Sequence, residues 1–156
     1  IIDKIPASFE KYLILLSSAL LFDKKIKIKM NKLIIDAANK EIFLMIISSG
    51  KVYNICFENS KINYEKLMIL IMNFLKSKNL KIEDISTIFV NRGPGSFAGI
   101  RNALSLVKGL YVSKEIDYYC YSFEDFVDVK NIKYEDIPYL CNKFMIKKNL
   151  NKPFYN

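Results

Sequence analysis

The sequence predicts a single α/β lobe whose mixed sheet forms in the order β-β-β-α-β-α-β. Short apolar stretches rich in β-branched residues recur along the chain between turn-forming residues. Two longer segments, 63–79 and 96–114, instead repeat apolar residues at helical spacing. The order in which the two patterns follow one another gives this fold class.

Three strands open the predicted lobe, at residues 32–36, 41–49 and 52–57. Gly50 and Lys51 predict a hairpin turn, so these strands form an antiparallel meander. The helix over 63–79 is predicted from an apolar stripe. The stripe consists of Leu67, Leu70, Ile71, Phe74 and Leu75. A strand from Thr87, the helix over 96–114, a strand over 116–121 and a short helix capped by Ser122 complete the lobe.

Composition indicates one globular domain with at most a short appendage. The chain has 156 residues, of which 51% are hydrophobic and 26% charged. The net charge of +8 invites a nucleic-acid interpretation. However, every basic residue except Arg92 and Arg101 is lysine, and lysine, isoleucine and asparagine enrichment is what AT-biased coding produces. The charge is therefore weak evidence for RNA contact, and strong, direct RNA binding is not expected.

Cysteine and histidine usage excludes several chemistries. The chain has no histidine, and Cys56, Cys120 and Cys141 are far apart without a C-x-x-C pair. A zinc site and a Ser-His or Cys-His catalytic pair are therefore not expected. We expect no metal and no cofactor, and three buried free thiols of a cytoplasmic protein.

The lobe is expected to occupy residues 30–126, between two shorter segments. Residues 1–29 form an N-terminal extension, predicted to be helical, that precedes Met30. Its apolar part, 7–22, is too short to span a membrane and lacks the order of a signal peptide. Residues 127–156 form a short C-terminal tail.

The most informative stretch is 87–111, in which an apolar β-branched run meets a glycine-rich turn and then a helical pattern. Gly93, Pro94 and Gly95 make the turn, and Ser96 is a natural helix N-cap. Exposed amides at a helix start attract phosphate, which is one interpretation. No Gly-Lys-Ser/Thr follows, and the glycine spacing is one residue too long for a dinucleotide fingerprint. The other interpretation is a packing turn, in which glycines let strand and helix approach closely.

Residues 91–101, NRGPGSFAGIR, and the following 102–110, NALSLVKGL, closely resemble the G-R-G-P-G-S-F-T-G-L-R…A-K-G-L block of the TsaB (YeaZ) family. Those proteins serve in threonylcarbamoyladenosine (t6A) modification of tRNA in bacteria. The resemblance extends over about residues 31–126, through IDAA at 35–38, NYEKL at 63–67 and SFEDF at 122–126. It implies a ribonuclease H-like lobe of the actin-like ATPase superfamily. The second lobe of the family is expected to be largely missing, with 127–156 as its remnant.

Asp36 marks a departure from the nucleotide-binding members of that superfamily. They hold phosphate in the first hairpin with a D-x-G-T/S sequence, whereas Ala37, Ala38 and Asn39 follow Asp36 here. Glycine and hydroxyl donor are both absent, so this degenerate phosphate hairpin is not expected to support ATP hydrolysis. Asp36 is instead predicted to make turn hydrogen bonds at the end of its strand.

The resemblance implies a non-catalytic subunit that binds and stabilises the catalytic subunit TsaD through its two helices, with TsaE reached through the complex. When TsaD is absent, a second copy takes its place. The expected partner-facing residues are Tyr64, Leu67, Ile71, Phe97, Ile100, Arg101, Leu104 and Val107. The motif turn comprises Arg92, Gly93, Pro94, Gly95, Ser96 and Gly99. Arg92 or Arg101 is expected to pair with a partner's carboxylate.

Two other functions remain open from the sequence. One is a small nucleotide-binding enzyme of the actin-like superfamily that uses the turn at 93–96 as a phosphate site. The other is a degenerate paralogue that retains only self-association. The sequence also leaves open which stripe of each helix faces outward, because a helix that only packs on its own sheet shows the same pattern.

Overall fold

The computed structural model describes residues 11, 12, 15 and 30–155. The predicted N-terminal helix within 1–29 therefore lies largely outside the described residues. In the part that is described, no helix has both the length and the apolar character needed to cross a membrane.

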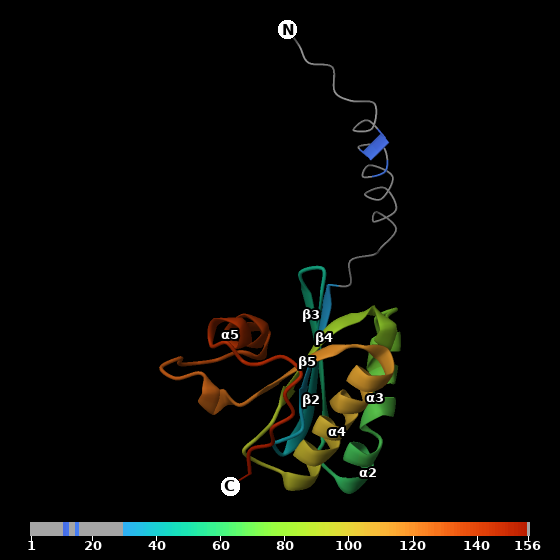
Figure 1. The fold of residues 1–156 in the computed structure, drawn as a ribbon. Coiled ribbons are helices and arrows are strands. Elements are labelled where there is room, and N and C mark those ends of the chain that lie inside the picture. The colour runs from blue at the N-terminus through green and yellow to red at the C-terminus, as the bar shows by residue number, and fades with distance from the viewer. Residues whose placement is uncertain (1–10, 13–14, 16–29, 156) are drawn as a thin grey trace.

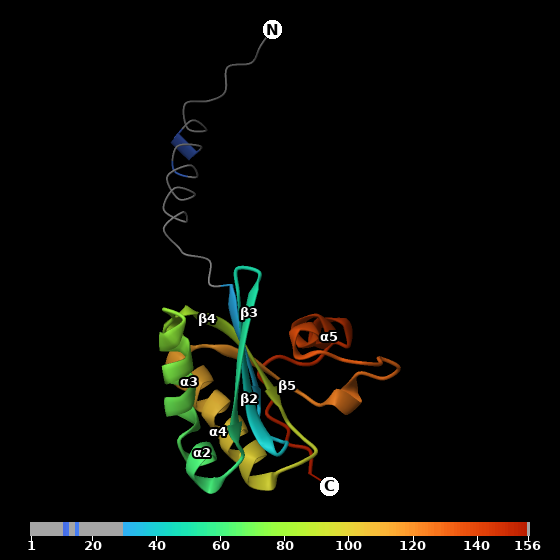
Figure 2. The ribbon, with the colours of Figure 1, turned by 180° about the vertical axis from the view of Figure 1, so that it is seen from behind.

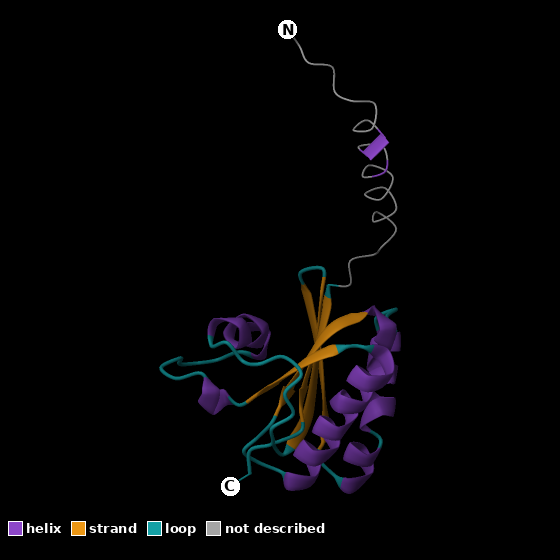
Figure 3. Cartoon of the chain, in the orientation of Figure 1, coloured by secondary structure: helices purple, strands orange, loops and turns teal. Residues whose placement is uncertain are grey.

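One five-stranded mixed sheet organises the lobe (Figures 1 and 3). Its strands are β1 (Asn31–Asp36), β2 (Glu41–Ser48), β3 (Lys51–Glu58), β4 (Ile85–Asn91) and β5 (Asp117–Tyr121), in the spatial order β3-β2-β1-β4-β5. The pairs β1–β2 and β2–β3 are antiparallel, whereas β1–β4 and β4–β5 are parallel. The predicted fold class and element order are confirmed.

The β2–β3 hairpin turns one residue earlier than predicted. Ser49 and Gly50 both have positive φ, 49° and 75°, and Lys51 is already the first residue of β3. A two-residue loop with positive φ at both positions matches the right-handed twist of the flanking strands. The meander is thus closed as tightly as a hairpin allows.

Three helices cover one face of the sheet (Figure 2). The single helix predicted over 63–79 is divided at Lys66 into α2 (Lys61–Glu65) and α3 (Leu67–Ser77). Ser60 starts α2 by accepting a hydrogen bond from the Asn63 amide. The second predicted helix is α4 (Phe97–Lys114), and Ser96 caps it as expected.

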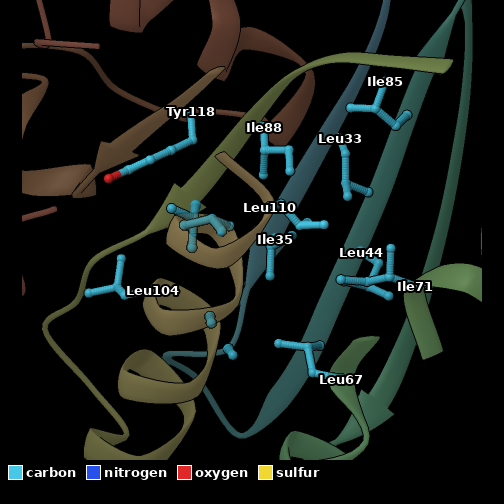
Figure 4. Close-up of a cluster of buried hydrophobic side chains, with 14 of the residues drawn as sticks. Leu33, Ile35, Leu44, Leu67, Ile71, Ile85, Ile88, Leu104, Leu110 and Tyr118 are labelled. Atoms are coloured by element: carbon cyan, nitrogen blue, oxygen red, sulfur yellow. The ribbon is translucent and has the colours of Figure 1, made fainter. Parts of the chain in front are cut away.

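The main core lies between these helices and the sheet (Figure 4). Leu33 and Ile35 of β1 and Leu44 of β2 point toward the helices, and Leu67 and Ile71 of α3 meet them. Alternation along each strand sends every second side chain to this face. The apolar stripe of α3 is therefore the stripe that faces inward.

The opposite face of the sheet is covered by residues that follow β5 (Figure 1). These form the short 3-10 turns η2 (Phe123–Asp125) and η3 (Tyr134–Asp136) and the helix α5 (Ile137–Lys143). Ile137 and Leu140 of α5 bury against Ile34 and Phe89 of the sheet. This layer gives the sheet a second, smaller core.

The cysteines differ in one respect from expectation. Cys120 and Cys141 are buried, and burial raises the pKa of each thiol to about 12. Cys56 is exposed, because β3 is an edge strand and no described helix covers this side of it. The expectation of three buried thiols is therefore wrong at Cys56.

A pair of isoleucines two residues apart on α3 tests which stripe carries the core. Ile71 is fully buried, whereas Ile69 is 56% exposed. We expect Ile71→Ala to lower the free energy of unfolding by about 2–5 kcal/mol, because it leaves a cavity in the core. Ile69→Ala should change it by less than about 0.5 kcal/mol. Urea unfolding measures both, and equal losses would contradict the inward orientation of this stripe.

Candidate functional site

The motif turn packs directly against the turn between β1 and β2. The Ser96 amide donates to the Ala38 carbonyl oxygen at 2.7 Å. A Cβ on Gly95 would overlap the Ala38 carbonyl oxygen, and one on Gly99 would overlap that of Ala37. Only glycine permits this approach of two backbones. The motif glycines thus fix where α4 begins relative to the first hairpin.

Four amides of the motif turn are engaged inside the fold, those of Arg92, Gly93, Ser96 and Gly99. The Arg92 amide donates to the Tyr121 carbonyl oxygen at 2.7 Å, and the Gly93 amide donates to Asn91 Oδ1 at 2.9 Å. The Ser96 hydroxyl accepts a hydrogen bond from the Gly99 amide at 3.3 Å. A phosphate site at this turn would need such amides to point outward. The engaged amides favour a packing turn, the second of the two interpretations.

Asp36 is a buried junction between four segments. Its carboxylate accepts hydrogen bonds from the Ala38 amide at 2.9 Å and from Asn39 Nδ2 at 3.1 Å, the predicted turn contacts. It also accepts from Asn91 Nδ2 at 2.9 Å and from the Tyr134 hydroxyl at 2.7 Å. The side chain is fully buried. A carboxylate so well supplied with donors stabilises its surroundings and leaves little capacity to hold a ligand.

Two tyrosines near Asp36 are held in the neutral form. Burial, and after it the Asp36 carboxylate, raises the pKa of Tyr134 well above its usual range. The same two causes raise the pKa of Tyr121. Tyr134 therefore remains a hydrogen-bond donor to Asp36 at neutral pH.

Arg92 has its carboxylate partner within the chain. Its Nη2 lies 2.6 Å from Oδ1 of Asp125, and its Nε lies 3.4 Å from the other oxygen. The two side chains are only 18% and 20% exposed. The guanidinium also lies over the Phe154 ring, 5.2 Å from its centroid. The expectation that Arg92 pairs across an interface is therefore not supported, whereas Arg101 is exposed and has no salt bridge to a described residue.

The structure divides the expected partner-facing residues into two groups. The buried group, which lies in the core between helices and sheet, consists of Leu67, Ile71, Ile100, Leu104 and Val107. These side chains are unavailable to a partner, because the strongest apolar stripe of each helix is the one that packs on the sheet. Tyr64 is half-buried, Arg101 is exposed and Phe97 is 57% exposed beside the ring of Tyr155.

Sequence reasoning missed other exposed apolar side chains on the same helices. These are Ile62 of α2, Ile69 and Met72 of α3, and Val112 of α4. We call these four residues and Phe97, five in all, the outer helix set. Their signal was present, since each is an apolar residue that falls outside the main stripe of its helix. Contiguous patches of exposed apolar side chains, in contrast to single ones, are typical of protein interaction surfaces.

This chain is similar to known proteins over part of its length. Residues 58–122 match the family model described as "TsaD: tRNA N6-adenosine threonylcarbamoyltransferase". The chain is 30% identical over 67 residues to the tRNA threonylcarbamoyladenosine biosynthesis protein TsaB of Buchnera aphidicola subsp. Baizongia pistaciae. That match covers 43% of this chain and 30% of the relative.

Two solved structures have the same fold. One is YeaZ from Pseudomonas aeruginosa, and the other is described as a protein with similarity to peptidase YEAZ from Pseudomonas aeruginosa. Each superposes with a TM-score of 0.55 at 20% identity, over 59% of this chain and 43% of the other. The chain therefore spans less than half of these related structures.

Gly95 and Gly109 provide a matched test of the packing turn. A Cβ at Gly95 would collide with the Ala38 backbone, whereas Gly109 in α4 has open space around it. We expect Gly95→Ala to lower the free energy of unfolding by roughly 2 kcal/mol or more. Gly109→Ala should raise it by about 0.5–1 kcal/mol, because alanine favours a helix. Thermal unfolding of both variants would reveal the difference, and a harmless Gly95→Ala would show that the close approach is not needed.

The hydrogen bond from Tyr134 to Asp36 can be removed with little change of shape. Tyr134→Phe should lower the free energy of unfolding by about 1.5–3 kcal/mol, since the acceptor is a buried charged group. Tyr139→Phe is the control, because Tyr139 is an exposed residue of α5. Chemical denaturation compares the two variants. Identical unfolding midpoints would show that the hydrogen bond from Tyr134 to Asp36 does not stabilise the fold.

Proposed function

We propose, starting from the confirmed resemblance of this chain to the TsaB (YeaZ) family, that it serves in tRNA threonylcarbamoyladenosine biosynthesis. In this proposal the chain is a non-catalytic, cytoplasmic partner subunit. It binds and stabilises TsaD, and it meets TsaE and tRNA only through the resulting complex. The names of the curated relative and of the matching family model both support this pathway.

The observation that carries the proposal is the outer helix set on the layer of α2, α3 and α4. Ile69 and Met72 stand three positions apart on α3, so they share one side of that helix. Exposed side chains of this size have no role in the chain's own core. We propose this surface as the docking face for TsaD, with Tyr64 and Arg101 at its margin.

The motif turn supports an indirect role. In our proposal it orients α4, and through α4 it positions the docking face. Gly95 and Gly99 set the approach of α4 to the first hairpin, and Ser96 caps the helix. In this proposal the glycines and serine of the turn position α4, and TsaD carries out the reaction.

The alternative, a small nucleotide-binding enzyme with its phosphate site at 93–96, is less well supported. The Ser96 amide is held by the Ala38 carbonyl, and the Asp36 carboxylate already has four donors. The described residues also contain no cluster of three or more cysteine, aspartate or glutamate side chains suited to a metal ion. Magnesium-bound ATP should therefore leave the melting temperature of the isolated chain unchanged. A ligand that binds the folded chain would stabilise it by about 2.7 kcal/mol at a hundredfold excess over its Kd, so a clear rise in melting temperature would favour the alternative.

Replacing both Ile69 and Met72 with glutamate should abolish co-purification with the cognate TsaD. Two carboxylates would have to be desolvated at the centre of the docking face. Because both residues are exposed, the variant should fold normally, which circular dichroism verifies. The binding readout is affinity co-purification after co-expression, followed by t6A formation in a reconstituted reaction.

The matched control for this experiment lies on the other side of the sheet. Val127→Glu also places a carboxylate at an exposed apolar residue, in the segment between η2 and η3. This variant should bind TsaD as the natural chain does. Full binding of TsaD by the Ile69→Glu, Met72→Glu variant would contradict the assignment of the helix layer as the docking face.

A further inference from the structure

The two edges of the sheet differ in how they are protected. The β5 edge is covered by the chain itself, since Lys148 bridges to Tyr119 in antiparallel fashion. The Asn149 amide donates to the Tyr118 carbonyl oxygen at 2.8 Å, and the Tyr118 amide returns a bond to Asn149 Oδ1 at 2.9 Å. At the other edge, no described residue pairs with the outer side of β3.

The β3 edge lacks the features that normally prevent association. The strand is eight residues long, and its register with β2 runs without a bulge from Lys51 to Glu58. It contains no proline, and its charged residues stand only at its two ends. Val52 and Ile55 expose apolar side chains between them. A long regular edge of this kind is a template for pairing with another strand.

The hairpin determines which backbone groups are free. The Asn59 amide donates to the Lys40 carbonyl oxygen at 3.0 Å, so residue 59 points toward β2. Orientation alternates along a strand, which turns the amides of Val52, Asn54 and Cys56 outward. The outward carbonyl of Glu58 is already satisfied by the Ser60 amide and by Asn63 Nδ2. The free edge is therefore centred on 52–56.

We propose that β3 pairs with β3 of a second copy of this chain, antiparallel, about a two-fold axis at Ile55. In an antiparallel pair, outward-pointing residues must stand opposite outward-pointing residues. With the axis at Ile55, Asn54 exchanges both backbone hydrogen bonds with Cys56 of the second copy. The two five-stranded sheets then join into one continuous sheet.

Side chains select this register over its neighbour. With the axis at Ile55, Tyr53 stands opposite Phe57 of the second copy and Ile55 stands opposite itself. Aromatic and β-branched residues are favourable cross-strand pairs. An axis at Asn54 would place Tyr53 opposite Ile55, but it would also place the charged Lys51 opposite Phe57. About Ile55 the helix-facing side chains of the strand are self-complementary without a charged residue among the pairs, which is why a second copy suits it better than an arbitrary strand.

The face of β3 that turns toward the helices leaves room for these contacts. Ile55 and Phe57 line a groove of about 230 Å³ with Leu70, Asn73, Phe74 and Ser77 of α3. Side chains of the second strand would cover this groove from the side. The pairing uses the sheet edge, whereas the proposed docking of TsaD uses the outer helix set, so the pairing goes beyond that docking and does not depend on it.

Proline at position 54 tests the pairing without disturbing the chain's own sheet. The Asn54 amide points outward, so Asn54→Pro removes a donor to the second copy and none to β2. Asn54→Ala is the matched control and keeps that donor. We expect sedimentation equilibrium to show a dimer for the natural chain and for Asn54→Ala. Asn54→Pro should raise the dimer Kd at least about tenfold, since the symmetric pair loses two hydrogen bonds.

Cross-linking tests the register itself. In a Cys56→Ser background, Ile55→Cys places two thiols opposite each other at the axis, and oxidation should yield a covalent dimer. Asn54→Cys in the same background is the control and should not cross-link efficiently. Its side chain lies on the other face of the sheet and stands opposite position 56 of the second copy, which is serine in this background. A monomeric natural chain, an unchanged Kd in Asn54→Pro or equal cross-linking of both thiols would overturn the proposal.

The two surfaces can be separated in the same set of proteins. The Ile69→Glu, Met72→Glu variant should still form this dimer, and Asn54→Pro should still bind TsaD. The opposite result would overturn the edge pairing. If the Ile69→Glu, Met72→Glu variant is monomeric and Asn54→Pro is still a dimer, self-association belongs to the helix layer.

Discussion

The contact between the motif turn and the first hairpin is the constraint on which the rest of the lobe depends. One backbone hydrogen bond, from the Ser96 amide to the Ala38 carbonyl, joins the start of α4 to the end of β1. The Asp36 carboxylate beside it binds Asn91 of β4 and Tyr134 of the opposite layer. Both faces of the sheet are therefore tied to one corner. A buried charge with this many donors is costly to disturb, so the corner is also a point of structural specificity.

This constraint limits what the corner can do chemically. A hairpin that holds phosphate must keep its amides and a hydroxyl available, and it must tolerate a second negative charge. Here the carboxylate of Asp36 is enclosed, and Ala37 and Ala38 supply no hydroxyl. The same backbone geometry that could receive an anion is filled by the chain itself. Packing and ligand binding are competing uses of one turn, and in this lobe packing occupies it.

Local features were predictable from sequence, and long-range ones were not. The order of strands and helices, the Ser96 cap and the turn contacts of Asp36 follow from residues only a few positions apart. The pairing of Arg92 with Asp125, and of Asp36 with Tyr134, joins residues 33 and 98 positions apart, and no local pattern specifies it. The members of the outer helix set other than Phe97 were missed for a related reason. A helical stripe is visible because it is continuous, and the continuous stripe is the one that packs inward.

The helix layer and the β3 edge point in different directions, which makes their proposed partners compatible. A docking face on α2 to α4 lies above the sheet, whereas strand pairing extends the sheet within its own plane. A subunit that uses the first to hold a catalytic partner can use the second to bring two such complexes together. Because a two-fold axis perpendicular to the sheet keeps both helix layers on the same side, the two catalytic partners would also face the same way. The covered β5 edge prevents further addition of strands, so pairing at β3 closes at a dimer and does not continue into a filament.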